Sequence, residues 1–211
     1  MLTPAEAKRV IEAVDTTTAR GYRDRTILEV FYATGIRKDE LRNLKVEDVN
    51  MEEGLLRINE GKGGRDRVAP LSRIAVRFLE TYLKGIRPEL LKGRSTDRVF
   101  LSATGRPLDP HTVGDIVRDH AQRAGIKKHV TCHTWRHTCA THLLKNNANL
   151  RHVQELLGHR SLATTERYLQ LTIADLKAAH AKFHPREKDA ARDDERSCET
   201  RVKKATFASA L

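Results

Sequence analysis

The chain contains few cysteines, and their number is odd. Among its 211 residues there are three, Cys132, Cys139 and Cys198. A sparse, odd set argues against a framework of disulfide bonds and indicates a reducing compartment. The sequence also lacks an apolar signal region at its N-terminus and any apolar run of membrane-spanning length. We therefore expect a cytoplasmic protein that has no membrane partner.

Internal repeats and nucleotide-binding motifs are also missing. The glycine-rich segment Gly61-Lys62-Gly63-Gly64 does not have the Gly-x4-Gly-Lys-Ser/Thr spacing that cradles nucleotide phosphates. No ATP site is indicated. The length suits one sizeable domain, and the charged share of 32% against 39% hydrophobic residues predicts a core beneath a heavily charged surface.

Positive charge is what the sequence has in excess. It contains 39 Lys and Arg against 28 Asp and Glu, which gives a net charge of +11 and a pI near 9.8. Lys and Arg displace the counterions condensed on phosphates, so a basic body is typical of a protein that binds a polyanion. A soluble protein that is basic for another reason has the same composition, and charge alone does not decide between the two.

Helix caps and apolar stripes predict a mainly α-helical domain with a small antiparallel β-sheet or hairpin, an α+β fold. Thr3, Pro4 and Glu6 form a capping box with proline at the first helical position, and Gly35 and Gly158 are typical helix ends. Residues 55–58 and 67–69 are predicted to be short strands beside the glycine-rich turn, Arg98–Leu101 to be another, and the helix from Ser72 to end near Gly85 and Pro88. The expected helices contain, in turn, Val10, Phe31, Leu41, Phe78, Val117, Arg136, Val153, Thr165 and Leu176.

The charge pattern changes near residue 185. Residues 185–211 alternate between positive and negative charges, contain one aromatic residue and show no sustained period. This composition is typical of a disordered or loosely attached tail. We expect a folded domain over residues 1–184 and a solvated tail without chemistry over 185–211.

His133, Arg136 and His137 lie on one side of a predicted helix, at 100° per residue. His133 and Arg136 are three residues apart and project together, as a pair that grips one phosphate must. The planar guanidinium donates two parallel hydrogen bonds to phosphate oxygens and keeps its charge at any working pH. For this pair alone, a solvated helix face is the stronger interpretation.

A zinc site is the other interpretation of this helix. His133 and His137 have the i, i+4 spacing of zinc-binding helices, but Thr134 stands where a metalloprotease has its Glu. Cys139 and His142 point to the opposite side of the helix, so a tetrahedral site would require the helix to break. We expect no metal.

A nucleophile and an acid are available elsewhere in the chain. In the helix that Ser161 is predicted to begin, Leu169 lies on the inward stripe. Tyr168 is about 100° away from Leu169 around the helix, so it is not simply part of that stripe. A tyrosine hydroxyl has an ordinary pKa of about 10, but nearby cations stabilise the phenolate and make attack on phosphorus feasible. Lys62 lies in a glycine-rich turn from which it can protonate a leaving oxygen. Taken singly, each residue has a simpler interpretation. Tyr168 would be a half-buried core residue, and Lys62 would lie on a flexible solvated loop, with or without a phosphate contact.

In their order and spacing, four segments together resemble the catalytic domain of the tyrosine recombinases, the phage-integrase family, and especially its Xer-like members. The resemblance covers roughly residues 1–184 and implies the catalytic-domain fold of that family. Inside the third segment Trp135 replaces the usual leucine, and we expect it to pack inward. The segments are Thr34-Gly35-Ile36-Arg37-Lys38-Asp39-Glu40-Leu41, the Gly61–Gly64 turn, His133-Thr134-Trp135-Arg136-His137, and Leu156-Leu157-Gly158-His159 with Tyr168 nine residues later.

The resemblance implies a site-specific DNA recombinase that cleaves and rejoins strands through a 3′-phosphotyrosyl intermediate. One ester is exchanged for another, so neither ATP nor a metal nor any other cofactor is expected. The supporting residues are Glu40, beside the first arginine, and His137, in the third segment. The implied catalytic residues are Arg37, Arg136 and His159 as the phosphate clamp, Tyr168 as the nucleophile, Lys62 as the acid and His133 as a proton-transfer residue.

Double-stranded DNA is the partner that the resemblance implies, with a nucleoid-associated location. It also implies self-association as a tetramer on paired sites through the helix at 172–183, whose apolar stripe has no obvious partner; packing on its own domain is the alternative. Family members usually have an N-terminal core-binding domain, which we expect to be absent here. Two other functions compete: a type IB topoisomerase, which relaxes supercoils, and a catalytically idle DNA-binding module.

Overall fold

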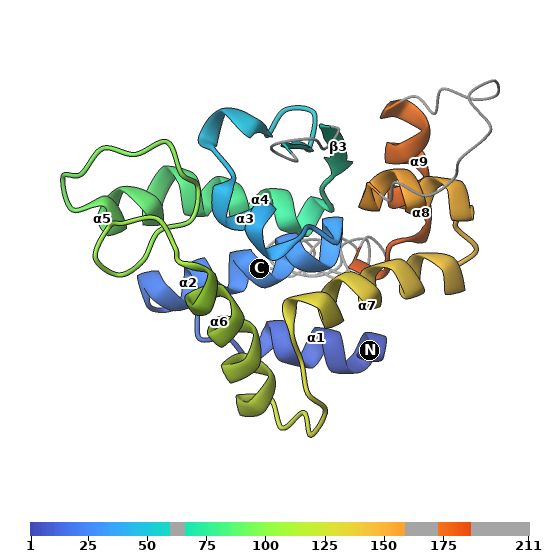
Figure 1. Cartoon of the computed structure of the whole chain (residues 1–211), viewed down its shortest axis with the longest axis horizontal. Helices are drawn as coiled ribbons and strands as arrows, with labels where there is room; N and C mark the ends of the chain where they lie inside the picture. The colour runs from blue at the N-terminus through green and yellow to red at the C-terminus, as the bar shows by residue number, and fades with distance from the viewer. Residues whose placement is uncertain (60–65, 159–172, 187–211) are drawn as a thin grey trace, which may run out of the picture.

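The computed structural model describes residues 1–59, 66–158 and 173–186 of the chain. The described part is mainly helical with one three-stranded antiparallel sheet, which confirms the predicted fold class (Figure 1). Within these ranges no helix is both long enough and apolar enough to cross a membrane. In chain order the elements are α1 (Pro4–Glu12), α2 (Ala19–Thr34), α3 (Lys38–Asn43), the 3₁₀ turn η1 (Val46–Asp48), β1 (Val49–Asn50), β2 (Leu55–Ile58), β3 (Arg67–Pro70), α4 (Arg73–Thr81), the π-helical turn η2 (Tyr82–Ile86), α5 (Arg87–Leu91), α6 (Pro110–Arg123), α7 (Cys132–Lys145), α8 (Leu150–Leu157) and α9 (Ile173–Phe183).

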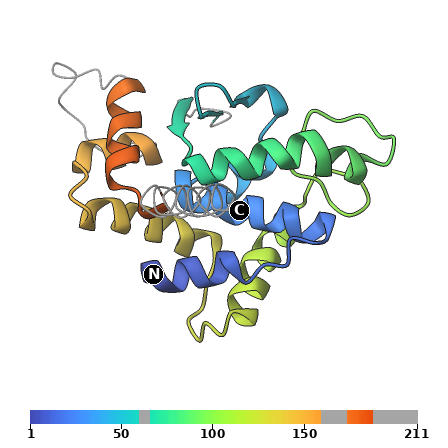
Figure 2. The ribbon, with the colours of Figure 1, turned by 180° about the vertical axis from the view of Figure 1, so that it is seen from behind.

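Helix α2 passes through the middle of the fold and contacts α1, α4 and α7 (Figures 1 and 2). Its predicted stripe, which includes Ile27 and Phe31, is buried, but its other faces are buried as well, including Arg25 and Glu29. A buried carboxylate is costly unless it is paired and hydrogen-bonded. Glu29 accepts from Arg25 Nε at 3.1 Å and from Arg186 Nη2 at 2.6 Å, so ion pairs make the burial of α2 on these faces possible.

The sheet has the order β1-β2-β3, with both neighbouring pairs antiparallel. The two predicted strands are present as β2 and β3, and β1 is an additional short strand that was not predicted. Leu56 pairs with Ala69, and Ile58 pairs with Arg67 at the end of the ladder. Leu56 and Ile58 are buried while Arg57 between them is exposed, as the alternation of a one-sided sheet requires.

The strand predicted at Arg98–Leu101 was wrong. The segment forms only two isolated bridges, Lys45 to Arg98 and Leu101 to Pro107. Val99, Phe100 and Leu101 are all fully buried, so the side chains do not alternate between two faces as those of a strand do. The segment enters the core as irregular chain, and the Val99 amide donates to the Leu44 carbonyl at 2.9 Å.

The helix predicted to end near Gly85 and Pro88 instead continues to Leu91. After α4 the chain passes Gly85 in the wider π turn η2, and Pro88 falls in the first turn of α5. In that position the missing N–H of proline removes no helical hydrogen bond. The end is set by Lys92, which adopts the left-handed conformation with φ of 50°.

Helix α9 packs on its own domain, against α7, α8 and β3 (Figure 1). Ala179 and His180 are buried, and Phe183 packs against the core. Two residues of the predicted stripe, Ala179 and Phe183, therefore have partners within the domain, and the role of this helix in self-association stays a prediction. The side chains of Ile173 and Leu176 lie outside the described part of the chain, as does the helix predicted to begin at Ser161.

The folded body extends past the predicted boundary at residue 184. Helix α9 ends at Phe183, but His184 is 0% exposed and Arg186 is 3% exposed. Arg186 is held by its ion pair with Glu29 of α2. A boundary read from composition misses this contact because the two partners are 157 residues apart. The predicted tail from 187 onward lies outside the described residues.

Two histidines join the C-terminal segment to the end of α2. His180 Nε2 donates to the Ala33 carbonyl at 2.8 Å, and His184 Nε2 donates to the Tyr32 carbonyl at 2.7 Å. The last carbonyls of a helix have no partner within the helix, so these contacts satisfy them. The second ring nitrogen of His184 accepts from the Arg186 amide at 3.2 Å, which fixes the imidazole in its neutral form. Burial, then His180, Arg186 and His142, holds the pKa of His184 well below its usual value.

Acidification is therefore expected to destabilise the protein. The unfolded chain binds a proton at His184 below about pH 6.5 and the folded chain does not, so the stability contributed by the neutral form is lost as the pH falls through this value. From pH 7.5 to 5.5 one such histidine lowers the free energy of unfolding by roughly 1 kcal/mol. Urea unfolding across this range measures the effect, which we expect to be smaller in His184→Gln and unchanged in His111→Gln, an exposed control. Equal pH dependence in His184→Gln and the unmodified chain would refute this assignment.

Candidate active site

The first predicted motif lies at the turn between α2 and α3. Gly35 ends α2 with φ of +60°, in the left-handed region that favours glycine. A Cβ atom at this position would lie 2.6 Å from Leu157 Cδ2, so glycine also permits the close approach of α8. Ile36 is fully buried and anchors the turn. Arg37 then occupies the N-cap position of α3.

Arg37 is fixed at its base by Glu40. The Arg37 amide donates to Glu40 Oε2 at 2.7 Å, and Arg37 Nη1 donates to Glu40 Oε1 at 2.7 Å. The Glu40 side chain is 7% exposed, whereas that of Arg37 is 40% exposed. The buried carboxylate thus orients the guanidinium from the protein side, and the guanidinium remains accessible from solvent.

Arg136 comes to the same place from α7. It is 7% exposed, and its Nη1 and Nη2 donate to the carbonyls of Gly35 at 2.7 Å and Leu157 at 2.6 Å. Burial, together with the charges of Arg37 and Arg67, lowers the pKa of Arg136 to about 10, so it stays charged at neutral pH. Trp135, which directly precedes Arg136, is fully buried, as predicted, and its ring contacts the Tyr32 ring edge-on.

Arg67 also belongs to this cluster, although the sequence pattern did not indicate it. Its Nη1 and Nη2 donate to the two oxygens of Glu40 at 2.8 Å each, and its Nε donates to the Leu156 carbonyl at 3.0 Å. Its sequence context predicts only the start of a strand. A possible signal was an arginine on a strand that immediately follows the glycine-rich turn with Lys62, but its partner Glu40 is 27 residues away.

The carboxyl group of Glu40 is ionised under all ordinary conditions. Burial by itself would raise its pKa, but the hydrogen bonds from the Arg67 side chain and the Arg37 amide outweigh burial and lower the pKa to about 2. A charged carboxylate with charged partners makes stronger hydrogen bonds than a neutral one. Glu40 therefore acts as a fixed anion that spaces two arginines.

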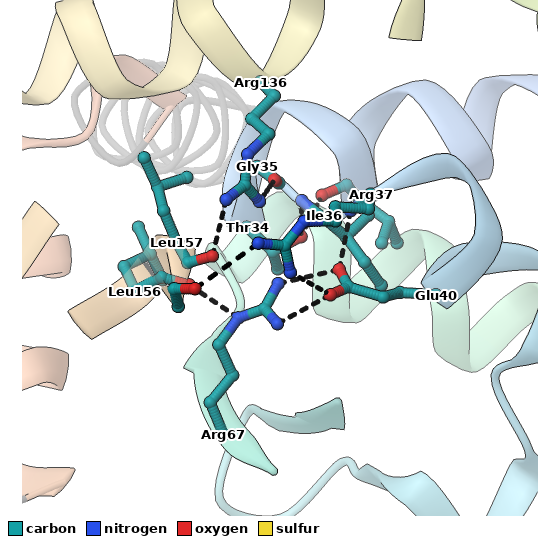
Figure 3. A network of polar contacts seen from close by, with 11 residues as sticks. Thr34, Gly35, Ile36, Arg37, Glu40, Arg67, Arg136, Leu156 and Leu157 are labelled. Carbon is teal, nitrogen blue, oxygen red and sulfur yellow. Dashed lines mark hydrogen bonds and ion pairs between the residues drawn. The ribbon is translucent and has the colours of Figure 1, made fainter. Parts of the chain in front are cut away.

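Three successive carbonyls at the end of α8 accept hydrogen bonds from the three arginines (Figure 3). Leu156 accepts from Arg67, Leu157 accepts from Arg136, and Gly158 accepts from Arg37 Nη2 at 3.4 Å. The C-terminal end of a helix carries partial negative charge and unpaired carbonyls, both of which favour cations. This helix end therefore gathers arginines from α3, β3 and α7 into one cluster.

A cavity of about 430 Å³ opens beside this cluster. Cys132 is one of its lining residues, but burial raises the pKa of its thiol to about 11, so it is a neutral thiol and not a nucleophile at neutral pH. The cationic wall of the cavity suits an anion of the size of a phosphate diester. The basic residues on that wall are Arg37, Lys38, Arg118, His129, His133 and Arg136.

The two histidines of the third motif differ in position. His133 lines the cavity on the exposed side of α7. His137 is exposed one turn further along the helix, and among the described residues it is not part of the cavity wall. Cys139 and His142 face the core, where His142 Nε2 contacts the Leu2 carbonyl at 3.0 Å and its Nδ1 the Tyr32 hydroxyl at 2.8 Å. In the described ranges no three potential metal-ligating side chains converge.

Lys62, His159 and Tyr168 lie outside the described residues. Two described residues of the cluster flank these segments in the sequence: Arg67 follows the segment that contains Lys62, and Gly158 directly precedes His159. Of the predicted clamp, Arg37 and Arg136 are brought together on one cavity, although they are 99 positions apart in the sequence numbering.

The sequence and the fold were compared with known proteins. A family model described as the phage integrase family matches residues 1–174. The tyrosine recombinase XerD of Staphylococcus aureus is 42% identical over 181 residues, which cover 86% of this chain and 61% of that protein. XerD of Staphylococcus epidermidis matches with the same identity and coverage. The chain thus spans about three fifths of the length of these relatives.

Solved structures agree with the sequence match. The crystal structure of XerA recombinase has a TM-score of 0.68 and 36% identity, and the match covers 85% of this chain and 63% of that one. The site-specific recombinase XerH, solved bound to its difH substrate before cleavage, has a TM-score of 0.65 and 26% identity, with 90% of this chain and 51% of that chain covered.

Proposed function

The chain belongs to the phage integrase family of tyrosine recombinases, and from this we propose that it cleaves and rejoins double-stranded DNA at specific sites. The observation that carries the proposal is the convergence of Arg37 and Arg136 on one cationic cavity that His133 also lines. The structural neighbour XerH was solved bound to its difH substrate, which supports DNA as the partner proposed here and, with it, a nucleoid-associated location.

In the proposed reaction, Arg37, Arg136 and His159 bind the non-bridging oxygens of the scissile phosphate and stabilise the charge that develops on them. The Tyr168 oxygen attacks phosphorus, a 3′-phosphotyrosyl ester forms, and the bond to the 5′-oxygen breaks. Lys62 donates a proton to that oxygen, and His133 assists proton transfer from the tyrosine. Glu40 and His137 support the clamp. A 5′-hydroxyl of a partner strand reverses the step, so one ester replaces another and no ATP, metal or other cofactor enters the balance.

A trapping experiment tests this function. The protein is incubated with a pool of duplexes that carry a nick near a randomised sequence, because the short strand released by cleavage then diffuses away and leaves the covalent product. We expect a protein–DNA band that survives denaturation without ATP and in the presence of a chelator, and sequencing of the bound DNA gives the preferred site. A protein that binds the pool but never forms this band is a DNA-binding module. Relaxation of supercoiled plasmids without that site would instead indicate a topoisomerase.

We also propose self-association as a tetramer on paired sites through the helix at 172–183. Because α9 packs on its own domain, this assembly requires α9 either to leave its contacts there or to present another face to a neighbouring copy. Sedimentation of complexes with one-site and two-site duplexes measures the stoichiometry. We expect four copies on two joined sites, and a maximum of one copy per site would exclude the assembly.

A further inference from the structure

Arg67, at the start of β3, is nearly buried, with 8% of its side chain exposed. Two of its guanidinium nitrogens donate to the Glu40 carboxylate and the third to the Leu156 carbonyl, all within 3.0 Å. A guanidinium at this depth, engaged with protein groups along both edges, is poorly placed to touch a DNA phosphate. The contacts through which it can influence the reaction include those with Glu40 and with the end of α8.

Glu40 is shared evenly between Arg37 and Arg67. Its Oε1 accepts from Arg37 Nη1 at 2.7 Å and from Arg67 Nη1 at 2.8 Å. Its Oε2 accepts from the Arg37 amide at 2.7 Å and from Arg67 Nη2 at 2.8 Å. The position of the carboxylate is thus set from two sides, and loss of Arg67 removes two of the four hydrogen bonds described here.

Arg67 also sets the charge of the cluster. Arg37 and Arg67 contact the carboxylate of Glu40, and Arg136 lies close enough to feel its charge, so these four groups carry two net positive charges. Without Arg67 the net charge would be one, and Glu40 would neutralise Arg37 almost completely. In a partly buried site the Coulomb interaction with an anion is stronger than in water, so this difference matters for a phosphate in the cavity.

The same side chain packs at the end of α8. A Cβ at Gly158 would lie 2.9 Å from Arg67 Cδ, so Arg67 packs directly on the backbone that leads into His159. The register pair of Ile58 and Arg67 closes the ladder at the segment that contains Lys62. Arg67 therefore joins the first motif, the end of the β2–β3 ladder and the end of α8.

We propose that Arg67 is a positioning residue of the phosphate clamp, which holds Glu40, and through it the Arg37 guanidinium, at a fixed place relative to the end of α8. This inference rests on the proposed function, because a clamp needs a scissile phosphate. Arg67 does not touch the phosphate; it fixes the direction of a residue that does. Its loss misdirects Arg37 without removing it, so cleavage slows while DNA affinity is retained.

The test uses Arg67→Met, which keeps most of the apolar stem, and Arg67→Lys, which keeps the charge but not the bidentate fork. Arg57→Met, on the exposed side of β2, is the matched control for charge loss in the sheet. Single-turnover formation of covalent product is measured on the duplex selected by the trapping experiment. A displacement of about 1 Å in a positioned group lowers a rate by about 100-fold, which we expect for Arg67→Met. We expect the rate to be partly restored in Arg67→Lys and unchanged in Arg57→Met. The Kd for the duplex should change by less than about threefold in every variant. A normal cleavage rate in Arg67→Met overturns the inference.

A modified substrate separates positioning from a general loss of structure. In a duplex with a methylphosphonate at the scissile position, one charged non-bridging oxygen is replaced by a methyl group, so less clamp charge is needed. The difference between the unmodified protein and Arg67→Met should shrink to below about tenfold on this duplex, since the missing clamp interaction then matters less. A difference of unchanged size, with a lowered Tm, would assign Arg67 a merely structural role.

A spectroscopic measurement distinguishes failure of this inference from failure of the proposed function. If the unmodified protein forms no covalent product on any duplex, the proposed function fails. The Arg37 Nε–H resonance in NMR spectra of isotope-labelled protein still reports whether its side chain is held. We expect this resonance to shift and broaden in Arg67→Met and to stay unchanged in Arg57→Met. An unchanged Arg37 resonance in Arg67→Met would reject the positioning role whether or not DNA is cleaved.

Discussion

Replacing Tyr168 by phenylalanine is expected to abolish the covalent protein–DNA product and to leave DNA affinity nearly unchanged. The phenol oxygen is the atom that would bond to phosphorus, and phenylalanine lacks it while keeping the ring. The chain has four tyrosines, and the three in the described part are engaged elsewhere. Tyr32 and Tyr82 are buried with hydrogen-bonded hydroxyls, and Tyr22 packs against Phe78 with ring centroids 5.3 Å apart.

The measurement is the nicked-duplex trap, run beside a binding titration on the intact duplex. Tyr22→Phe is the matched control, because it removes a hydroxyl from a tyrosine that is only partly buried and should still be trapped at the normal rate. Burial raises the pKa of Tyr82 to about 12, so that residue is no substitute nucleophile. Covalent product from Tyr168→Phe at a rate near that of the unmodified protein would remove Tyr168 from the proposed role.

Arg136→Met is expected to have the second largest effect, on both the reaction and the stability. Loss of one preorganised donor to the developing charge lowers a rate by about 100- to 1,000-fold. The substitution also leaves the carbonyls of Gly35 and Leu157 without this donor, at a cost of about 1–3 kcal/mol for each group that stays buried and unsatisfied. The turn before Arg37 and the end of α8 would then both loosen.

Single-turnover cleavage and urea unfolding separate the two effects. Arg118→Met is the comparator: Arg118 lines the same cavity, but its side chain is 49% exposed and pairs with Asp115 at the surface. It should change cleavage by less than about tenfold and stability hardly at all. Arg136→Lys keeps the charge and should fall between the two. If Arg136→Met and Arg118→Met lose cleavage equally, the cavity contributes only a diffuse positive potential, and Arg136 has no special place in it.

The sequence predicted local structure well where one or two residues determine it. The capping box at Thr3 and the glycine end of α2 are present as predicted, because their partners are three or four residues away. The convergence of Arg37 and Arg136 followed from a family resemblance and not from any local rule. Local rules failed at Pro88, which the wider turn η2 places where proline is tolerated.

Contacts between distant segments could not be predicted. Arg67 reads as an ordinary strand residue, since nothing near it in the sequence announces that its partner is Glu40. The same limit applies to α2, whose apolar stripe suggested one buried face although Arg25 and Glu29 are buried too. Burial of such charges depends on partners that the fold alone supplies.

The ion pair between Glu29 and Arg186 makes the far end of the described chain a structural part of its second helix. Glu29 is 0% exposed, and Arg186 provides its shortest contact, at 2.6 Å. A version of the protein shortened to residue 184 would keep every predicted motif. It would leave the Glu29 carboxylate buried without Arg186, and of the two ion pairs described for it here the one with Arg25 would remain. Truncation at the limit of the resemblance is thus a destabilising mutation, and trimmed proteins intended for crystallisation or assay need to retain Arg186.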